Sequence, residues 1–511
     1  MVIPLRLPLS RQLVQAAALR AWGLVAIAAA VALAASLRYV TTPDGGVHPT
    51  FDDSFITLTF ARNLAEHGKL TFDGESWSTG ATSILHVMVL AVPIKLGVEP
   101  VRASIGVGIV AHVLLTMAVF WLGWAVFRSL VAAFAGALIV AFNHWAAFDS
   151  GGGLETGLFM ALVAATFASY LSFDTPRGRL LTGGLLALAV LTRPKGAFLL
   201  PALLVYEWLR RAPGEPLRSF GERAAPLAGP GVGALAALSL FALAVTGSFT
   251  PGTATAKMHF FQEYDFFFRD KITIMGEQVG QFLGSMLPVA VLAAVAANRR
   301  EALLFGLFWL PVLVMYVLVF PGGLGHYFFR YQHPVVPLLA ALAGGGAWML
   351  VRAAMENGYA AKALVAAAFV VLAVPAWQQY ENWRTTYGGA VFDLRGIEAM
   401  AQDLNNIVRP DETLAAHDIG AVGYYGRFHV LDVVGLVNPD VVEYNRDRTL
   451  NRYLQGRQPQ YLLTFEDWDD FFLRLGARFH PETYELVKRY THGPGEEAPY
   501  YLYRIHYPLP D

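Results

Sequence analysis

The chain has 511 residues, of which 55% are hydrophobic and only 15% are charged, with a formal net charge of −1 at pH 7. Soluble globular domains carry about 25% charged residues, so this composition predicts a polytopic α-helical membrane protein. It excludes a nucleic-acid-binding protein, which needs a clustered basic surface. The chain contains no cysteine, which excludes disulfides and thiolate metal sites.

Apolar segments long enough to cross a bilayer, roughly 17 to 25 residues, recur through the first three quarters of the chain. The segment 84–98 is shorter, contains Pro93 and carries His86 and Lys95, so we expect it to lie on the outer surface as a helix. Arginine-rich loops such as 210–223 then fall on the inner side, as the positive-inside rule requires. The predicted spans, about eleven, are 20–38, 101–127, 130–148, 155–173, 180–192, 196–209, 226–246, 281–297, 302–320, 334–351 and 363–377.

This topology predicts a multi-pass protein of the inner or plasma membrane, in contact with membrane lipid. The N-terminus, with its basic flank of Arg6, Arg11 and Arg20, is expected in the cytoplasm. Polar segments near the membrane then converge on the outer face. They are 39–100, 149–154, 247–280 and 321–333, and 192–195 reaches the same level.

The last quarter of the chain differs in charge, because residues 381–511 carry 20 acidic and 13 basic side chains. We expect residues 1–377 to form the transmembrane module and residues 378–511 to form a soluble extracytoplasmic α/β domain. Short β runs alternate with helical stretches there. The predicted strands are 413–417, 429–434, 461–465 and 500–507, and the predicted helices include 396–407 and 439–454.

Seven motifs stand in order on the predicted outer face. They are FDDSFITLTFARNLAEHGKLTFDGE (51–75), STGATSILH (78–86), GLETGLF (153–159), LTRPKGAFLLP (191–201), PGTATAKMHF (251–260), RYQHPVVPLLA (330–340) and HDIGAVGYYGRFHVLDVVGLVNP (417–439). Together they resemble those of the GT-C glycosyltransferases, which take a sugar from a polyprenyl-phosphate carrier. The resemblance runs nearly end to end and is closest to the branch of the mycobacterial terminal arabinofuranosyltransferases. Lys195 departs from the pattern, since related chains often have Glu after Arg-Pro.

The resemblance implies an inverting transfer of a sugar, such as arabinofuranose or mannose, from a polyprenyl-phosphate donor to a cell-envelope glycan or glycolipid acceptor. Such a reaction needs a carboxylate base and cations for the leaving phosphate. The likeness favours Asp52 as the base and Asp53 as its orienting partner or as an anion at the start of a helix near Ser54. Capping of that helix is the alternative for Asp53. Glu155 is the candidate second carboxylate, or it only favours a helix dipole.

Cationic side chains at the outer ends of spans are the candidates for binding the donor phosphate: Lys257, Arg330, Arg193 and Lys195. Lys257 and Arg330 are the first choices, and ordinary snorkelling of long side chains to the interface is the alternative.

Three further residues are candidates for binding the acceptor or the sugar, namely His259, His333 and Asp418. Asp418 precedes a glycine at a predicted strand end, where it could equally stabilise a turn. No cofactor is assigned, and the metal is unknown. The ligand spacing is not diagnostic, so a divalent cation such as Mg²⁺ or Mn²⁺ is left open.

Two other classes of function compete with the enzyme. A transporter or flippase of lipid-linked sugars would place charges near the bilayer midplane and often shows repeated halves. Here the charges crowd one interface and no repeat is visible, which favours the enzyme. A non-catalytic envelope scaffold would leave the paired Asp52 and Asp53 unexplained.

Overall fold

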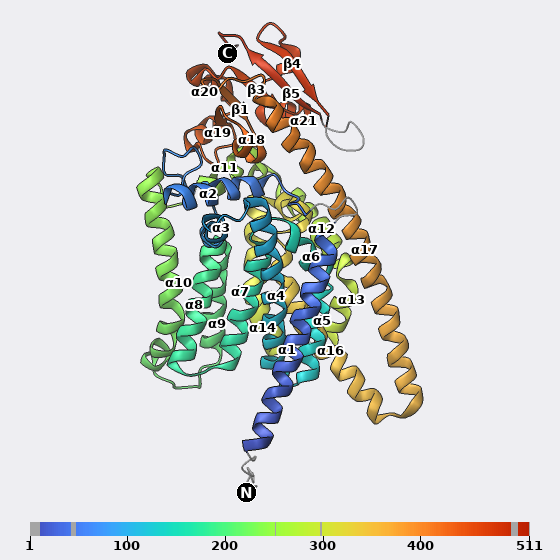
Figure 1. Cartoon of the computed structure of the whole chain (residues 1–511). Helices are drawn as coiled ribbons and strands as arrows, with labels where there is room; N and C mark the ends of the chain where they lie inside the picture. The colour runs from blue at the N-terminus through green and yellow to red at the C-terminus, as the bar shows by residue number, and fades with distance from the viewer. Residues whose placement is uncertain (1–10, 42–46, 251, 297–298, 492–498, 510–511) are drawn as a thin grey trace.

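A helical bundle carries a small sheet domain at one end in the computed structural model (Figure 1). The structure describes residues 11–41, 47–250, 252–296, 299–491 and 499–509. The first described helix starts at the opposite end of the bundle from this domain, so we name the two ends the domain end and the N-terminal end. Arg6 of the predicted basic flank and residue 297 of a predicted span lie outside the described residues.

Every predicted span coincides largely with helix. The bundle consists of α1 (Arg11–Val40), α4 (Pro100–Phe127), α5 (Leu130–Ala141), α6 (His144–Gly151), α7 (Thr156–Ser172), α8 (Pro176–Thr192), α9 (Leu199–Leu209), α10 (Leu217–Thr246), α12 (Phe268–Ser285), α13 (Leu287–Ala296), α14 (Arg299–Val319), α16 (Val336–Glu356) and α17 (Gly358–Leu404).

Among the described residues, six helices are long and apolar enough to cross a membrane, or up to eight if each of two bent pairs forms one span. The bent pairs are α5 with α6, at 54°, and α12 with α13, at 84°. Helices α7 and α8 have 17 residues each and α9 has 11, which is short for a span. The predicted number of about eleven membrane spans therefore stays a prediction.

Two predicted spans are not continuous helices. The span 130–148 breaks at Asn143, whose side chain accepts hydrogen bonds from the amides of Trp145 and Ala146 and so starts α6 as a new helix. In the span 281–297, the first turn belongs to α12, which runs at a steep angle to α13.

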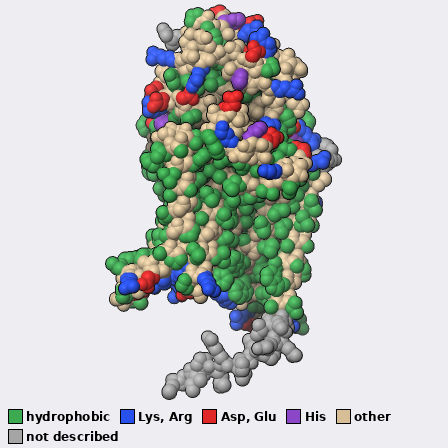
Figure 2. Space-filling view, turned by 60° about the vertical axis from the view of Figure 1, so that its left-hand side comes forward, with side chains coloured by type: hydrophobic (Ala, Val, Ile, Leu, Met, Phe, Trp, Pro, Cys, Tyr) green, Lys and Arg blue, Asp and Glu red, His purple; other side chains and the backbone are tan. Residues whose placement is uncertain are grey.

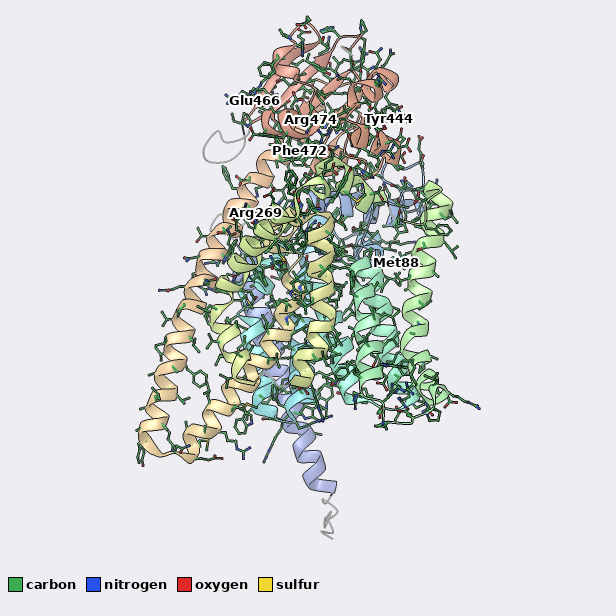
Figure 3. All side chains as sticks on the ribbon, turned by 180° about the vertical axis from the view of Figure 1, so that it is seen from behind. Met88, Arg269, Tyr444, Glu466, Phe472 and Arg474 are labelled. Carbon is green, nitrogen blue, oxygen red and sulfur yellow. The ribbon has the colours of Figure 1, made fainter. Side chains whose placement is uncertain are left out.

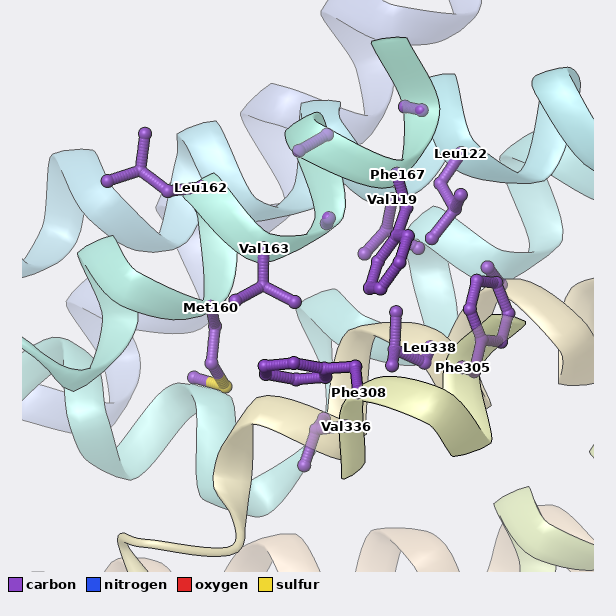
Figure 4. Packing of buried hydrophobic residues seen from close by; sticks show 14 of the residues in the cluster. Val119, Leu122, Met160, Leu162, Val163, Phe167, Phe305, Phe308, Val336 and Leu338 are labelled. Atoms are coloured by element: carbon purple, nitrogen blue, oxygen red, sulfur yellow. The ribbon is translucent and has the colours of Figure 1, made fainter. Parts of the chain in front are cut away.

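Charged side chains gather toward the two ends of the molecule, and hydrophobic side chains cover the middle (Figure 2). Inside the bundle, Phe167 of α7 packs edge-on against Phe305 of α14, with ring centroids 5.2 Å apart (Figure 4). Small residues let helices approach closely: a Cβ on Gly344 of α16 would lie 2.4 Å from the Ala132 carbonyl oxygen of α5. Such contacts between small residues are typical of helices packed in lipid.

Short helices form the domain end of the bundle. Helix α3 has 12 residues, too few to cross a bilayer, which agrees with the predicted surface helix at 84–98. Helix α2 lies across the bundle (Figure 1). The short elements are α2 (Asp53–His67), α3 (Ile84–Lys95), η1 (Pro194–Phe198), α11 (Gly252–Phe261), η2 (Glu263–Asp265), η3 (Pro321–Leu324), α15 (His326–Phe329) and η4 (His333–Val335).

Within the described residues, the C-terminal domain holds a five-stranded sheet in the order β2-β1-β3-β5-β4. The first three strands are parallel, and β5 and β4 are antiparallel additions. The four predicted strands are confirmed, and the sequence analysis missed β4. The strands are β1 (Thr413–Ala416), β2 (His429–Asp432), β3 (Tyr461–Thr464), β4 (Tyr484–Tyr490) and β5 (Tyr500–Ile505).

Helical segments connect these strands and dock the domain on the bundle. Phe472 lies where the domain meets the bundle (Figure 3). Its ring stacks on that of Phe260 of α11, with centroids 5.5 Å apart. Helix α17 runs without a break through residues 377 and 378, so the domain boundary predicted there stays a prediction. The predicted helix 396–407 largely coincides with the end of α17. The segments are α18 (Gly420–Tyr425), η5 (Pro439–Val441), α19 (Val442–Asp447), α20 (Leu450–Arg457), α21 (Glu466–Trp468), η6 (Asp469–Leu473) and η7 (Ala477–Phe479).

Candidate active site

A cavity of about 400 Å³ lies at the domain end of the bundle, and the C-terminal domain contributes Leu436 to its wall. One side is apolar, with Met315, Val319 and Phe320 at the end of α14. The other sides come from α2, the chain before α3, η1, α11 and the residues after α15. Segments far apart in the sequence therefore meet around one space.

All four cations predicted to bind phosphate line this cavity, together with two of the predicted carboxylates. Among the described residues on its wall, Arg193, Lys195, Lys257 and Arg330 face Asp53 and Glu155. Burial lowers the pKa of Lys195 well below its ordinary value, and the charge of Arg193 acts in the same direction. The positive charge of the cavity therefore rests on Lys257, Arg193 and Arg330. The two arginines are each less than 10% exposed, so their charges act in a poorly hydrated space and attract an anionic ligand strongly.

Asp53 is the carboxylate paired with two of these cations. Its Oδ2 atom accepts a hydrogen bond from Nη2 of Arg330 at 3.0 Å and lies 4.0 Å from Nζ of Lys257. Burial alone would raise the pKa of Asp53, but the charges of Lys257 and Arg330 outweigh it and hold that pKa below its ordinary value. Asp53 is therefore ionised at neutral pH and is a weak base. The carboxylate of Asp53 is therefore a counter-ion of Arg330 and Lys257, which is more than helix capping requires.

Arg330 is aimed at the cavity by a strained segment. The three residues before it, Tyr327, Phe328 and Phe329, have φ values of 45°, 56° and 63°, in the left-handed region. This conformation costs roughly 1–2 kcal/mol for each L-residue. Packing of the rings holds it in place, since the ring centroid of Tyr327 lies 4.7 Å from that of Phe51. Strain of this kind often marks functional sites.

Glu155 forms a buried ion pair with Arg193. Nε of Arg193 donates to Oε1 of Glu155 at 2.5 Å, and Nη2 donates to the Thr156 hydroxyl at 3.0 Å. In the described part of the chain, Nη1 of Arg193 and Nε of Arg330 are buried donors without a hydrogen-bond partner. Buried donors are rarely left unpaired. Their position fits an anionic ligand with several acceptor oxygens.

Tyr331 stands at the centre of the cations and was missed in the sequence analysis. Its ring lies 5.0 Å from Nζ of Lys195, 5.0 Å from Cζ of Arg330 and 5.4 Å from Cζ of Arg193. Its hydroxyl also accepts a hydrogen bond from Arg330 at 3.1 Å. An aromatic face between cations reduces their mutual repulsion. The RYQH motif was a signal for this role, because Tyr331 directly follows Arg330.

Asp52 faces the C-terminal domain. It is the N-cap residue of α2, but its side chain makes no capping bond to that helix. Its carboxylate accepts hydrogen bonds from the amides of Gly420 and Ala421, both at 2.8 Å. Burial raises the pKa of Asp52 to about 7, and the nearby charge of Asp418 acts in the same direction. A carboxylate with that pKa can accept a proton near neutral pH.

Neither Asp52 nor the remaining predicted residues lie on the cavity wall. His333 is buried, and its Nδ1 pairs with Oδ2 of Asp149 at 2.7 Å. Nδ1 of His259 on α11 lies 3.4 Å from the hydroxyl of Tyr264 in η2. Asp418 accepts a hydrogen bond from the Tyr500 hydroxyl at 2.7 Å. These contacts do not test the predicted roles in acceptor or sugar binding.

No three His, Asp or Glu side chains within the described ranges come close enough to hold a metal ion. The divalent cation left open by the sequence analysis remains a prediction.

Comparison with known proteins identifies the fold. Residues 376–503 match a family model described as a domain of unknown function, DUF8728. No curated protein matches the chain. ArnT from Cupriavidus metallidurans in the apo state is similar in structure, with a TM-score of 0.60 and 15% identity, over 94% of this chain and 98% of that chain. The apo Archaeoglobus fulgidus oligosaccharyltransferase is also similar, with a TM-score of 0.58 and 12% identity, over 87% of this chain and 69% of that chain.

The chain has the fold of the GT-C membrane glycosyltransferases. The same fold recurs in the Archaeoglobus fulgidus AglB in complex with an inhibitory peptide and a dolichol-phosphate, with a TM-score of 0.55 and 13% identity, over 90% of this chain and 72% of that chain. The predicted helical membrane module with a C-terminal α/β domain is confirmed. The likeness concerns the GT-C fold alone, so the arabinofuranosyltransferase branch stays a prediction.

Proposed function

We propose that this protein is an inverting glycosyltransferase that moves a sugar from a polyprenyl-phosphate donor to an acceptor outside the plasma membrane. The cavity carries this proposal: it combines four basic side chains, two carboxylates and an apolar wall at one end of a GT-C fold. The N-terminus would lie in the cytoplasm, and the site and the C-terminal domain would lie outside.

The donor phosphate would bind among the cations. Arg330 and Arg193 each offer a buried N–H group without a protein partner in the described residues, and Lys257 is partly exposed at the cavity wall. Guanidinium groups bind phosphate oxygens through charge-assisted hydrogen bonds. Met315 and Val319 on α14 give the adjoining wall the apolar character that a polyprenyl chain needs. A similar fold in complex with dolichol-phosphate supports a donor of this class.

The two adjacent carboxylates would divide the work. Asp53 stays ionised between Arg330 and Lys257, where it orients these cations. Asp52, whose pKa of about 7 suits a base, would take the proton from the acceptor hydroxyl. The hydroxyl oxygen then bonds to the anomeric carbon as the bond to phosphate breaks, and the cations stabilise the leaving phosphate. One displacement without a covalent intermediate inverts the anomeric centre.

The sugar and the acceptor follow only from the resemblance of the motifs. It favours arabinofuranose or mannose as the sugar and a cell-envelope glycan or glycolipid as the acceptor. The deciding experiment is mass spectrometry of the lipid that co-purifies with the protein, followed by a transfer assay with that lipid-linked sugar. A polyprenyl-phosphate sugar that is bound and turned over supports the proposal. A lipid-linked sugar that crosses proteoliposome membranes without transfer would contradict it and favour a flippase.

A further inference from the structure

The C-terminal domain meets the start of α2 through a short segment, residues 418–421, at the end of β1. The amide of Gly420 donates to Oδ2 of Asp52, and the amide of Ala421 donates to Oδ1. Both amides belong to the first turn of α18. Each oxygen of the Asp52 carboxylate is therefore held by the C-terminal domain and not by the membrane module.

This contact depends on a glycine. A Cβ on Gly420 would lie 2.1 Å from the backbone oxygen of Asp52 and 2.4 Å from its Oδ2 atom. Any other side chain would push the domain away from α2. The close approach of the two modules at this point is thus built into the sequence.

Asp418 is held beside the same contact from two sides. Its Oδ2 atom accepts a hydrogen bond from the hydroxyl of Tyr500 on β5 at 2.7 Å. Its Oδ1 atom lies 3.4 Å from Nδ1 of His417, whose ring stacks on Trp468 with centroids 4.5 Å apart. The sheet therefore fixes the place of a second carboxylate near Asp52.

The charged and titratable groups that face Asp52 come from four elements. Asp53 follows it on α2, and Tyr327 belongs to α15. Asp418 and Tyr500 come from the C-terminal domain. Burial is the main cause of the raised pKa of Asp52, and the negative charge of Asp418 raises it more than that of Asp53. Lys257 and Arg330 are paired with Asp53 instead.

We propose that Asp418 is a positioning residue of the C-terminal domain that holds a negative charge beside Asp52 and thereby keeps Asp52 able to take a proton. The inference rests on the proposed function, in which Asp52 is the base. It makes the C-terminal domain a working part of the active site, since this domain supplies both amides that hold Asp52 and the stronger in effect of the two negative charges that act on it.

The test is a pH titration of Asp52 in the full-length protein. Infrared difference spectra, with Asp52→Asn as the reference, measure the protonation of this carboxyl group and need no substrate. Asp418→Asn removes the charge but keeps an oxygen for the Tyr500 hydroxyl. We expect the titration of Asp52 to move down by about one pH unit, and Asp418→Glu should restore it. Asp411→Asn is the matched control, because this exposed carboxylate of the same domain pairs with Arg409.

The pH–rate profile of transfer is the second readout, and its acid limb should move with the titration. If Asp418→Asn does not fold, Asp418→Ser removes the same charge. If Asp52 titrates at the same pH in a folded variant that lacks the charge of Asp418, the inference is wrong. This holds even if the KM for the acceptor rises in that variant. A shifted titration in a protein that transfers no sugar would leave the inference standing and contradict the proposed function, so the two failures are distinguishable.

Discussion

Asp52 and Asp53 are neighbours in the chain, but their carboxylates belong to different environments. Asp53 pairs with Arg330 inside the cavity, and Asp52 accepts hydrogen bonds from Gly420 and Ala421 of the C-terminal domain. Successive residues at a helix start point about 100° apart around its axis, which separates the two side chains. In the proposed reaction, Asp53 would therefore act on the donor side and Asp52 on the acceptor side.

Asp52→Asn should abolish most of the transfer activity. Asparagine keeps the size of the side chain but cannot take a proton, and loss of a general base costs a factor of about 10² to 10⁴ in rate. One of its two hydrogen bonds to the domain is also lost, at about 1 kcal/mol. Donor affinity, measured by titration with a polyprenyl-phosphate sugar, should be unchanged. Wild-type turnover by an Asp52→Asn, Asp53→Asn double variant would show that these carboxylates are structural.

The transfer rate should rise with pH through about 7. The pKa of Asp52 is raised to about 7, so the base is protonated below this pH and ionised above it. Asp53 has a lowered pKa and stays ionised throughout that range. The measurement is kcat/KM for the acceptor between pH 5 and 9 (a range of roughly two units either side of the Asp52 pKa). A profile that is flat across neutral pH in the wild type would remove Asp52 as the base.

Lys257→Ala and Arg330→Ala should each weaken donor binding by roughly 1.5 to 3 kcal/mol, the scale of hydrogen bonds to charged groups. The larger loss is expected for Arg330, which is more deeply buried than Lys257. Arg352→Ala is the control, because this exposed arginine near the other end of α16 pairs with Glu356. Equal donor affinity in all three variants would leave only interfacial snorkelling for Lys257 and Arg330.

Arg193→Ala should destabilise the folded protein as well as weaken donor binding. It leaves Glu155 buried without its counter-ion, and breaking a buried ion pair from one side costs about 3–5 kcal/mol. The variant Arg193→Met, Glu155→Gln removes both charges, so it should recover much of the thermal stability without recovering donor affinity. Thermal unfolding in detergent measures the first effect. A double variant as unstable as Arg193→Ala would show that the pair is not the cause.

Labelling of introduced cysteines tests the orientation, and the absence of native cysteine makes each new thiol unique. Glu222 has an exposed side chain near the start of α10. Because the positive-inside rule places this end of α10 in the cytoplasm, Glu222→Cys should be protected from an impermeant thiol reagent in intact cells. Glu482→Cys lies on the exposed surface of the C-terminal domain and should react. The opposite pattern would place the cavity on the cytoplasmic side.

The cations of the cavity could be predicted because two independent signals agree. The positive-inside rule orients the spans, and the motifs then bring Lys257, Arg330, Arg193 and Lys195 to one face. The direction of Asp52 could not be predicted, because it depends on contact with a segment more than 360 residues away in the chain. The left-handed backbone before Arg330 is equally invisible, since ring packing and not local propensity maintains it.

The missed strand β4 has a simple physical explanation. It lies at the sheet edge, where Glu485, Lys488 and Arg489 are exposed. Charged side chains protect edge strands from pairing with other chains, but they also weaken the alternation that marks a strand in the sequence. The breaks at Asn143 and between α12 and α13 were hidden for the opposite reason, because the predicted spans 130–148 and 281–297 contain no Asp, Glu, Lys or Arg.

Helix α17 joins the N-terminal end of the bundle to the C-terminal domain. Its 47 residues extend about 70 Å, and its last turns pack against α18, whose first amides hold Asp52. Membrane helices change their tilt when the bilayer is thinner or thicker than their apolar length. A tilt of only ~5° would move the far end of such a rod by ~6 Å. A change in the tilt of α17 would therefore reach the amides of Gly420 and Ala421, which hold Asp52.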